Sequence, residues 1–263
     1  MKYVKEHIDE RNVARLALNR PEIHNAFNDE LIRELTGRVD ELNRDERLRL
    51  MVLTGEGKSF CAGADLNWMK SMKDYSLDEN IRDSEKLDGL FAAIRRSPVP
   101  VIGLINGPAF GGGTGLVSVC DYAAAVESAL FGFTETRLGL VPAVISPYVM
   151  EKIGAASARA WFLSGERFDA RTARQINLVD EIVPEEKLKQ RGEEIIAGFL
   201  KAAPEAQRHA KTLIREVERL RKNGDDAAVR KYTTGLIAKL RVSDEGQEGM
   251  AALLEKRKPS WLE

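Results

Sequence analysis

The segment SPVPVIGLINGPAFGGGTGLVSVCD, residues 97–121, decides how this chain folds, because no side chain in residues 97–120 is charged. A run of that length is long enough to span a membrane. Three prolines and six glycines interrupt it, so an unbroken helix through it would be costly. We therefore expect no membrane span and no membrane partner. The segment instead predicts a buried strand at 101–105, a turn at 106–108, and a helix that begins at the glycines 111–113.

Glycines at the start of a helix leave its first backbone N–H groups accessible. These N–H groups have no partner within the helix and lie at the positive end of its dipole, which suits an oxyanion or a phosphate. The phosphate-binding pattern GxxxxGK[ST] and the dinucleotide pattern GxGxxG are both absent, so the segment favours an enolate or carbonyl oxygen. Close packing of the helix against a strand is the alternative, because glycine also marks close backbone approach.

Composition excludes several classes of protein. The chain has 263 residues, of which 43% are hydrophobic, 31% are charged and 6% are aromatic, and its net charge is −1. This balance is typical of a globular protein and gives no bulk attraction to nucleic acid or anionic membranes. No nucleic-acid partner is expected, since no aromatic and basic surface motif is present.

Location and metal content are also expectations from sequence. The first 20 residues lack the apolar core of a secretory signal, which predicts a cytoplasmic protein. Cys61 and Cys120 show no CxxC spacing and fit reduced thiols. The histidines His7, His24 and His209 are far apart in sequence, so no metal site is predicted.

Strands, small-residue bends and helices alternate, which predicts an α/β core. Strands are expected at 13–18, 48–53, 101–105, 122–126, 129–131 and 178–183. Helices are expected from residue 28 and at 77–96, 148–153, 156–163, 170–175, 185–200, 204–221, 225–240 and 244–257. The helix at 77–96 is predicted to turn Ile81, Leu87, Leu90, Phe91 and Ile94 inward. We expect a core over residues 1–200 and a helical segment over 201–263 within the same domain, whose apolar stripes form an oligomer contact. Those stripes contain Leu236, Ile237, Leu240, Met250, Leu253 and Leu254.

Three segments together resemble the crotonase (enoyl-CoA hydratase/isomerase) superfamily. They are SFCAGADL at 59–66, NGPAFGGG at 106–113, and FGFTE at 131–135 followed by LGLVP at 138–142. The resemblance covers residues 10–185 and implies a spiral of ββα turns with a C-terminal helical segment, assembled as homotrimers or homohexamers. It also implies an acyl-CoA substrate and no separate cofactor, because coenzyme A is carried by the substrate.

The resemblance further implies an oxyanion hole, in which the N–H groups of Ala64 and Gly112 hold the thioester oxygen as it becomes an enolate. Removal of one such donor typically costs about 3–4 kcal/mol of transition-state stabilisation. It also implies a larger set of residues that bind substrate or coenzyme A: His24, Asn25, Ala26, Ala62, Gly63, Asp65, Leu66, Gly111, Gly115 and Pro142.

Glu135 matches the carboxylate that hydratases of this family use as general acid and base; without the surrounding motif it reads as a surface glutamate. Many of these hydratases carry a second glutamate where this chain has Gly115. One carboxylate suffices for a 1,3 proton shift, so a Δ3-Δ2 enoyl-CoA isomerase is the alternative. Segments 67–69, 109–117 and 142–149 look like the branch that hydrates methylglutaconyl-CoA and isohexenylglutaconyl-CoA, which implies hydration and a place in leucine degradation. A non-catalytic or RNA-binding relative is a further alternative.

Overall fold

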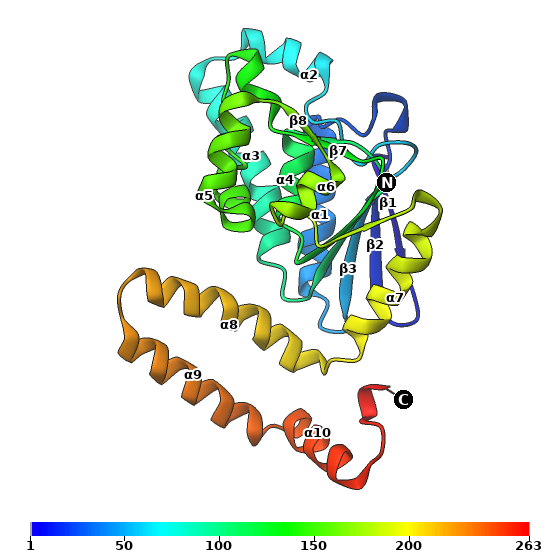
Figure 1. Cartoon of the computed structure of the whole chain (residues 1–263), viewed down its shortest axis with the longest axis vertical. Helices are drawn as coiled ribbons and strands as arrows, with labels where there is room; N and C mark the ends of the chain where they lie inside the picture. The colour runs from blue at the N-terminus through cyan, green and yellow to red at the C-terminus, as the bar shows by residue number, and fades with distance from the viewer. Residues whose placement is uncertain (1, 263) are drawn as a thin grey trace. The chain divides into compact units, whose positions relative to one another are not determined.

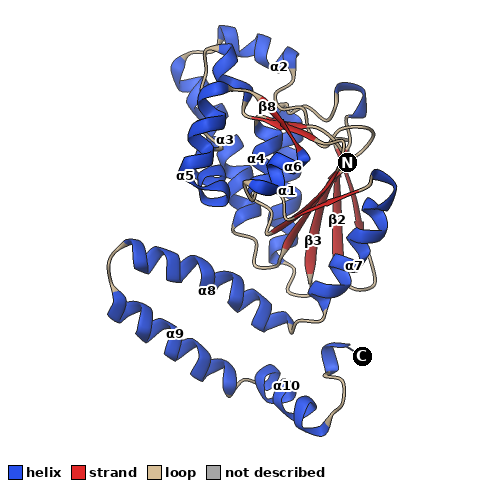
Figure 2. Ribbon diagram, viewed as in Figure 1, coloured by secondary structure: helices blue, strands red, loops and turns tan. Residues whose placement is uncertain are grey.

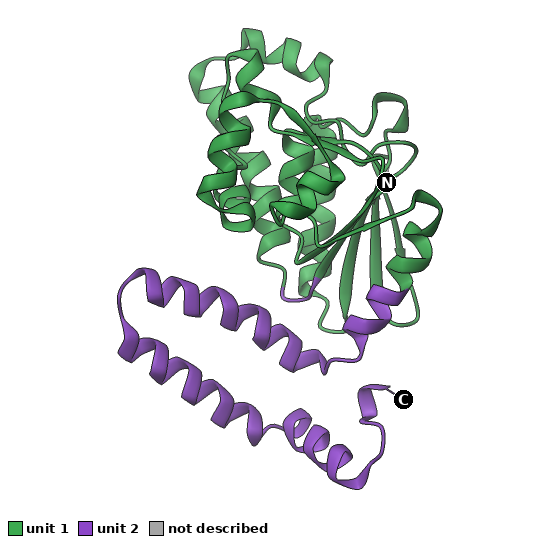
Figure 3. Ribbon diagram, in the orientation of Figure 1, with its two compact units in different colours: residues 1–97, 101–193 green, residues 98–100, 194–263 purple. Residues whose placement is uncertain are grey.

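A computed structural model describes residues 2–262, which form two compact units (Figure 3). Unit 1 comprises the described residues of 1–97 and 101–193, and unit 2 comprises those of 98–100 and 194–263. Both sheets belong to unit 1. Unit 2 is helical (Figure 2).

The main sheet of unit 1 has six strands in the order β1-β2-β3-β4-β6-β9. Only the β1–β2 pair is antiparallel; the other neighbours run parallel, as the predicted alternation of strands and helices requires. A second sheet has the order β5-β7-β8. The strands are β1 (Val4–Ile8), β2 (Val13–Leu18), β3 (Leu50–Gly55), β4 (Val101–Ile105), β5 (Ala109–Phe110), β6 (Tyr122–Val126), β7 (Leu130–Gly132), β8 (Arg167–Asp169) and β9 (Glu181–Val183).

The predictions for β2, β4 and β6 are confirmed at both ends, whereas three other strands are shifted or shortened. The strand predicted at 129–131 is β7, which lies one residue later. The strand predicted at 48–53 begins at Leu50, because the N–H of Leu48 donates to Asp45 in the turn that ends the preceding helix. The strand predicted at 178–183 begins at Glu181, because the N–H of Leu178 donates back to Ala173. In β3 and β9, the first residues of the predicted apolar run therefore belong to a turn and not to the strand.

Helices of unit 1 lie beside the main sheet, with α3, α4 and α5 on one side of it (Figure 1). They are α1 (Asp29–Arg44), α2 (Leu66–Ser71), α3 (Leu77–Arg95), α4 (Gly112–Ser118), α5 (Ser146–Ser164) and α6 (Ala170–Gln175). Short 3-10 turns occur at Pro21–Ile23, Met72–Asp74, Thr134–Leu138 and Glu185–Lys187. Helix α7 (Leu188–Leu200) begins in unit 1 and ends in unit 2.

Local sequence explains how the helices α1 and α3 begin. The side chain of Asn28 accepts from the N–H of Leu31, and Ser76 and Glu79 form a reciprocal capping box. The prediction that Ile81 points inward is wrong, because its side chain is 47% exposed. The buried apolar side chains of α3 lie in its second half and begin at Leu90.

The glycine-rich segment joins β4 to α4 by close backbone packing. A Cβ added at Gly113 would lie 2.1 Å from the carbonyl oxygen of Cys61, and one at Gly107 would lie 2.2 Å from that of Lys58. Both positions therefore require glycine for space. The close packing considered as an alternative from sequence is present at the same place as the predicted helix start.

Unit 2 contains the rest of α7, then α8 (Pro204–Lys222), α9 (Asp226–Arg241), α10 (Asp244–Glu255) and a short turn, Ser260–Leu262. The ammonium group of buried Lys211 donates to the carbonyl oxygen of Val99 at 2.9 Å. Among the described residues, no helix combines the length and the apolar character needed to cross a membrane.

Replacement of Gly113 by alanine is expected to lower the free energy of unfolding by roughly 1–3 kcal/mol or more, because backbone must move to admit the methyl group. The matched control is Gly37→Ala in the exposed part of α1, where no atom lies within 4 Å of the added Cβ. That variant should be stabilised by about 0.5–1 kcal/mol. Urea titration of both variants measures the difference, and equal stabilities would contradict the packing argument.

Candidate active site

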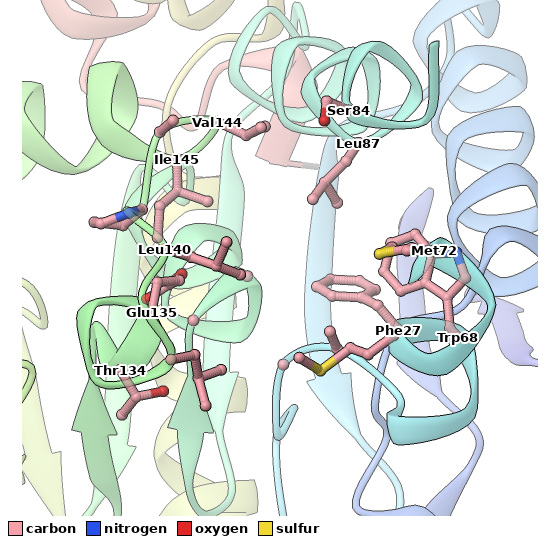
Figure 4. A pocket seen from close by; sticks show the side chains of 18 of the residues that line it. Phe27, Trp68, Met72, Ser84, Leu87, Thr134, Glu135, Leu140, Val144 and Ile145 are labelled. Atoms are coloured by element: carbon pink, nitrogen blue, oxygen red, sulfur yellow. The ribbon is translucent and has the colours of Figure 1, made fainter. Parts of the chain in front are cut away.

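One cavity of about 670 Å³ gathers the sequence motifs of unit 1. Figure 4 shows Glu135 and Leu140 on one wall, with Phe27 and Met72 facing them across the space, and Ser84 reaching in from α3. The lining residues are Phe27, Ala62, Gly63, Ala64, Leu66, Trp68, Met69, Met72, Asp83, Ser84, Leu87, Gly111, Gly112, Thr134, Glu135 and the run 138–145. Most of these side chains are apolar, so the cavity suits an acyl chain.

Ala64 is held at the cavity by its neighbours on both sides. The N–H of Phe27 donates to Gly63 at 2.7 Å, and the N–H of Asp65 donates to Phe27 at 2.8 Å. These two bonds form an isolated parallel bridge between Phe27 and Ala64. The N–H of Ala64 is left without a hydrogen-bond acceptor among residues 2–262.

Asp65 and Arg20 fix the loop that carries Ala64. Their side chains form an ion pair at 2.8 Å, with both groups nearly buried, and Arg20 also donates to the carbonyl of Ala26. Burial acts to raise the pKa of Asp65, but the N–H of Asn67 and the guanidinium of Arg20 hold this pKa below its usual value. Asp65 thus remains ionised and caps α2 beside the cavity.

Gly112 is the first residue of α4, and the strand-to-helix bend before it requires glycine. Gly111 has φ +51°, in the left-handed region, and its N–H donates to Gly132 at 2.9 Å. A Cβ added at Gly112 would lie 2.8 Å from the ring of Phe27. The N–H of Gly112 has no acceptor in the part of the chain that the structure describes. Two residues with free N–H donors, Ala64 and Gly112, therefore line one cavity.

Glu135 lies in the 3-10 turn Thr134–Leu138, which is closed by the N–H of Leu140 donating to the carbonyl of Glu135 at 3.1 Å. Its carboxyl group lies over Gly111, where an added Cβ would come within 3.2 Å of Oε1. Oε2 is buried and has no hydrogen-bond partner among the described residues. Burial raises the pKa of this carboxyl above its usual value, and its own backbone N–H opposes the rise only in part.

The structure brings eight of the predicted site residues to the cavity. They are Ala62, Gly63, Ala64, Leu66, Gly111, Gly112, Glu135 and Pro142. Five others do not line it: His24, Asn25, Ala26, Asp65 and Gly115.

Two of those five residues stabilise the turn before Phe27. The amide of Asn25 is fully buried and bonds to backbone groups of Arg20, Glu56 and Ser59. His24 is exposed, and its Nδ1 lies 2.9 Å from the hydroxyl of Ser59. The contact of this turn with coenzyme A stays a prediction.

Gly115 is buried in α4 and has no space for a side chain. An added Cβ would lie 2.5 Å from Cγ2 of Ile145 and 3.1 Å from Cζ of Phe91. Ile145 itself lines the cavity. An apolar side chain therefore takes the space beside Gly115, where many hydratases of the family carry a second glutamate.

Sequence reasoning missed Asp83, which also lines the cavity. Its side chain is 8% exposed, and burial is the main cause of its raised pKa. A signal for its inward position exists, since Asp83 is four residues before Leu87 and seven before Leu90 on the buried stripe of α3.

Within the described residues, no group of three or more His, Cys, Asp or Glu side chains could hold a metal ion. The thiol of Cys61 is fully buried, and burial raises its pKa to about 12. The cavity therefore contains two carboxyl groups and backbone donors as its chemically active groups.

Comparison with known proteins agrees with this geometry. The family model described as enoyl-CoA hydratase/isomerase matches residues 9–263. A crystal structure from Legionella pneumophila, provisionally named an enoyl-CoA hydratase/isomerase (crotonase), is 44% identical, with a TM-score of 0.92 over 99% of both chains. A Thermus thermophilus protein provisionally named an enoyl-CoA hydratase is 32% identical over 96% of this chain and 98% of its own. The 2,3-dehydroadipyl-CoA hydratase of Escherichia coli is 30% identical over 96% of both chains.

The chain belongs to the enoyl-CoA hydratase/isomerase family and has the crotonase fold. The resemblance drawn from the three sequence segments is confirmed at the level of the superfamily.

Glu135→Gln is expected to stabilise the protein increasingly as pH rises. Because the pKa of Glu135 is raised in the folded chain, the folded state holds more protons than the unfolded state between the two pKa values. The free energy of unfolding of the parent therefore falls as pH rises through that window, which begins near the ordinary value of about 4.3. Glutamine has no proton to lose. Urea titrations from about pH 4 to about pH 8 measure the difference.

The control for this experiment is Glu166→Gln, since Glu166 is exposed and does not line the cavity. A difference between Glu135→Gln and the parent that does not change with pH would contradict the burial argument.

Proposed function

We propose that this protein is an enoyl-CoA hydratase that adds water across the α,β double bond of an acyl-CoA thioester. The observation that carries the proposal is the buried carboxyl of Glu135, whose Oε2 has no hydrogen-bond partner among the described residues. This carboxyl lies over Gly111 in the cavity that Ala64 and Gly112, the residues with free N–H groups, also line. A general acid and base and an oxyanion site are the two parts that this reaction needs.

In the proposed reaction, the thioester oxygen accepts hydrogen bonds from the N–H groups of Ala64 and Gly112 as negative charge develops on it. The ionised carboxylate of Glu135 removes a proton from water while the water oxygen bonds to the β-carbon. The protonated Glu135 then gives a proton to the α-carbon. The raised pKa of Glu135 lies closer to neutral pH than that of an exposed glutamate. The carboxyl is therefore a better base toward water, and its protonated form can still give the proton to the α-carbon.

Isomerisation of a 3-enoyl-CoA is the second candidate. Ile145 fills the space beside Gly115, so the position of the usual second glutamate provides no carboxylate to help hold the water. A single carboxylate suffices for moving a proton between two carbons. The hydratase proposal draws support from the names of the relatives in Thermus thermophilus and Escherichia coli, which are those of hydratases.

The two reactions differ in whether oxygen enters the product. In H₂¹⁸O, a 2-enoyl-CoA ester is expected to give a 3-hydroxyacyl product that contains ¹⁸O, as measured by mass spectrometry. Glu135→Gln should lower this turnover at least about 10²-fold while acyl-CoA binding is retained, because glutamine cannot exchange the proton.

The exposed residue Glu166 again provides the matched control, and Glu166→Gln should turn over at the parental rate. Conversion of a 3-enoyl ester without ¹⁸O uptake by any 2-enoyl ester would favour the isomerase. Turnover of Glu135→Gln within a few-fold of the parent would remove Glu135 from its role.

The acyl group is a separate question. The prediction of a branched glutaconyl-type chain, and with it of a place in leucine degradation, rests only on the resemblance of the segments at 67–69, 109–117 and 142–149. A cytoplasmic location rests on the N-terminal sequence. The acyl chain, the pathway and the location all stay predictions.

We also propose that the protein is a homotrimer or homohexamer that uses its C-terminal helices. Apolar side chains of unit 2 are exposed in the single chain, with Leu253 79% and Leu254 82% exposed on α10. Met250 on the same helix and Ile237 on α9 are also exposed. Patches of this kind mark interaction sites on soluble proteins.

Replacement of Leu253 and Leu254 together by glutamate is expected to reduce the oligomer to smaller species, because charge would be buried in the contact. Light scattering after size exclusion measures the mass. The matched control replaces Leu163, which is also exposed but lies on α5 of unit 1. An unchanged mass in the double variant would place the contact elsewhere.

A further inference from the structure

Asp83 is an acidic side chain without a partner in the cavity. Its side chain makes no hydrogen bond or ion pair with any other residue in 2–262. The residue is nevertheless nearly buried, at 8% exposed. Buried carboxyl groups are normally paired. An unpaired carboxyl that lines a binding cavity acts on any ligand that enters, so a function for it is to be sought in the ligand.

The charged groups that act on Asp83 do not compensate its negative charge. Asp29 at the start of α1 adds negative charge, and Lys86, one turn later on α3, is the cation that acts on Asp83. Lys86 is exposed and does not line the cavity. Burial and Asp29 together raise the pKa of Asp83, which agrees with an environment that disfavours negative charge.

The cavity lining contains no cation. Among the lining residues of unit 1, the ionisable side chains are Asp83 and Glu135, and neither lysine, arginine nor histidine is present. In Figure 4, Ser84 and Leu87 enter the cavity from α3, on a different wall from Glu135. Asp83 belongs to the same helix, so the second carboxyl comes from the part of the cavity formed by α3.

We propose that Asp83 makes the acyl cavity selective for uncharged chains, so that enoyl-CoA esters ending in a carboxylate are poor substrates. The proposal rests on the acyl-CoA activity proposed above and names the substrate class of the same site. It goes against a glutaconyl-type chain, which would bring a third carboxyl group into a cavity without a cation.

The physical reason holds whichever way Asp83 titrates. If Asp83 and the chain's carboxylate are both ionised, two like charges repel each other across apolar surroundings. If one of them takes up a proton to avoid this repulsion, the free energy needed for that protonation at neutral pH weakens binding of the ester. An uncharged methyl end incurs neither cost, and it gains from the apolar side chains of Met72 and Leu87.

The test compares two esters that differ only at the chain end: trans-2-hexenoyl-CoA, which ends in a methyl group, and 2,3-dehydroadipyl-CoA, which ends in a carboxylate. The parent is expected to prefer the hexenoyl ester at least about tenfold in kcat/KM. Asp83→Asn keeps the size of the side chain and removes its charge, and should reduce that preference several-fold. Glu85→Gln is the matched control on α3, because Glu85 is exposed and does not line the cavity, and should leave the preference unchanged.

A binding measurement on the parent alone keeps the inference testable if Asp83→Asn fails to fold. The saturated esters hexanoyl-CoA and adipyl-CoA undergo no hydration, and calorimetry should give the tighter Kd for hexanoyl-CoA. Equal Kd values, an equal kcat/KM for the two enoyl esters, or an unchanged preference in a folded Asp83→Asn would overturn the selectivity. Absence of turnover of both enoyl esters, with hexanoyl-CoA still bound more tightly, would overturn the proposed hydration and leave the selectivity standing.

Discussion

The site depends on the close contact between residues 59–61 and 108–110. The N–H groups of Phe60 and Cys61 both donate to Pro108, and the N–H of Phe110 donates to Cys61 at 3.0 Å. The absence of side chains at Gly107 and Gly113 allows this approach, since a Cβ at either would overlap a backbone carbonyl. The contact fixes the loop that leads to Ala64 and the bend that leads to Gly112 in one rigid arrangement. Both candidate oxyanion donors therefore belong to one packed backbone unit, and their positions do not depend on side-chain rotamers.

The fold around Gly111 also keeps a costly carboxyl in the cavity. Glu135 has a buried oxygen without a partner, and it lies so close to Gly111 that a side chain at that position would crowd the carboxyl. A buried, unpaired acid lowers the stability of the folded state at neutral pH. The surrounding fold over-determines this arrangement through the paired strands β5 and β7 and the closed turn after Glu135. Such a balance is typical of active sites, where local destabilisation is offset by packing elsewhere.

The parts of the fold that could be predicted are those whose signal is local. The strand β4 and the start of α4 followed from an apolar run ended by glycine and proline, and both are confirmed. The strands β1, β5 and β8 were not predicted, because β1 carries charged residues and the other two are only 2 and 3 residues long and exist through their partners in the sheet. At the site, the motif residues from three segments were found, whereas Asp83 was missed because an acid on a helix is normally solvated. Ile81 was assigned inward by helical period alone, and the period cannot tell where along a helix burial begins.

The distribution of carboxyl groups limits what chemistry the cavity can support. Many hydratases of the family bracket one water between two glutamates, but here Ile145 takes the space beside Gly115, and the second acid of the cavity comes from α3 instead. A water molecule held by Glu135 alone needs another group to orient it. The described lining provides few polar side chains for this: the hydroxyls of Thr134 and Ser84, the carboxyl of Asp83, and the indole N–H of Trp68, which has no partner among the described residues. The acyl chain itself then becomes part of the active site, because its apolar packing excludes other water and fixes the β-carbon relative to Glu135. On this argument, selection of the chain and activation of the water are linked, and a chain that fits the α3 wall poorly loses turnover as well as affinity.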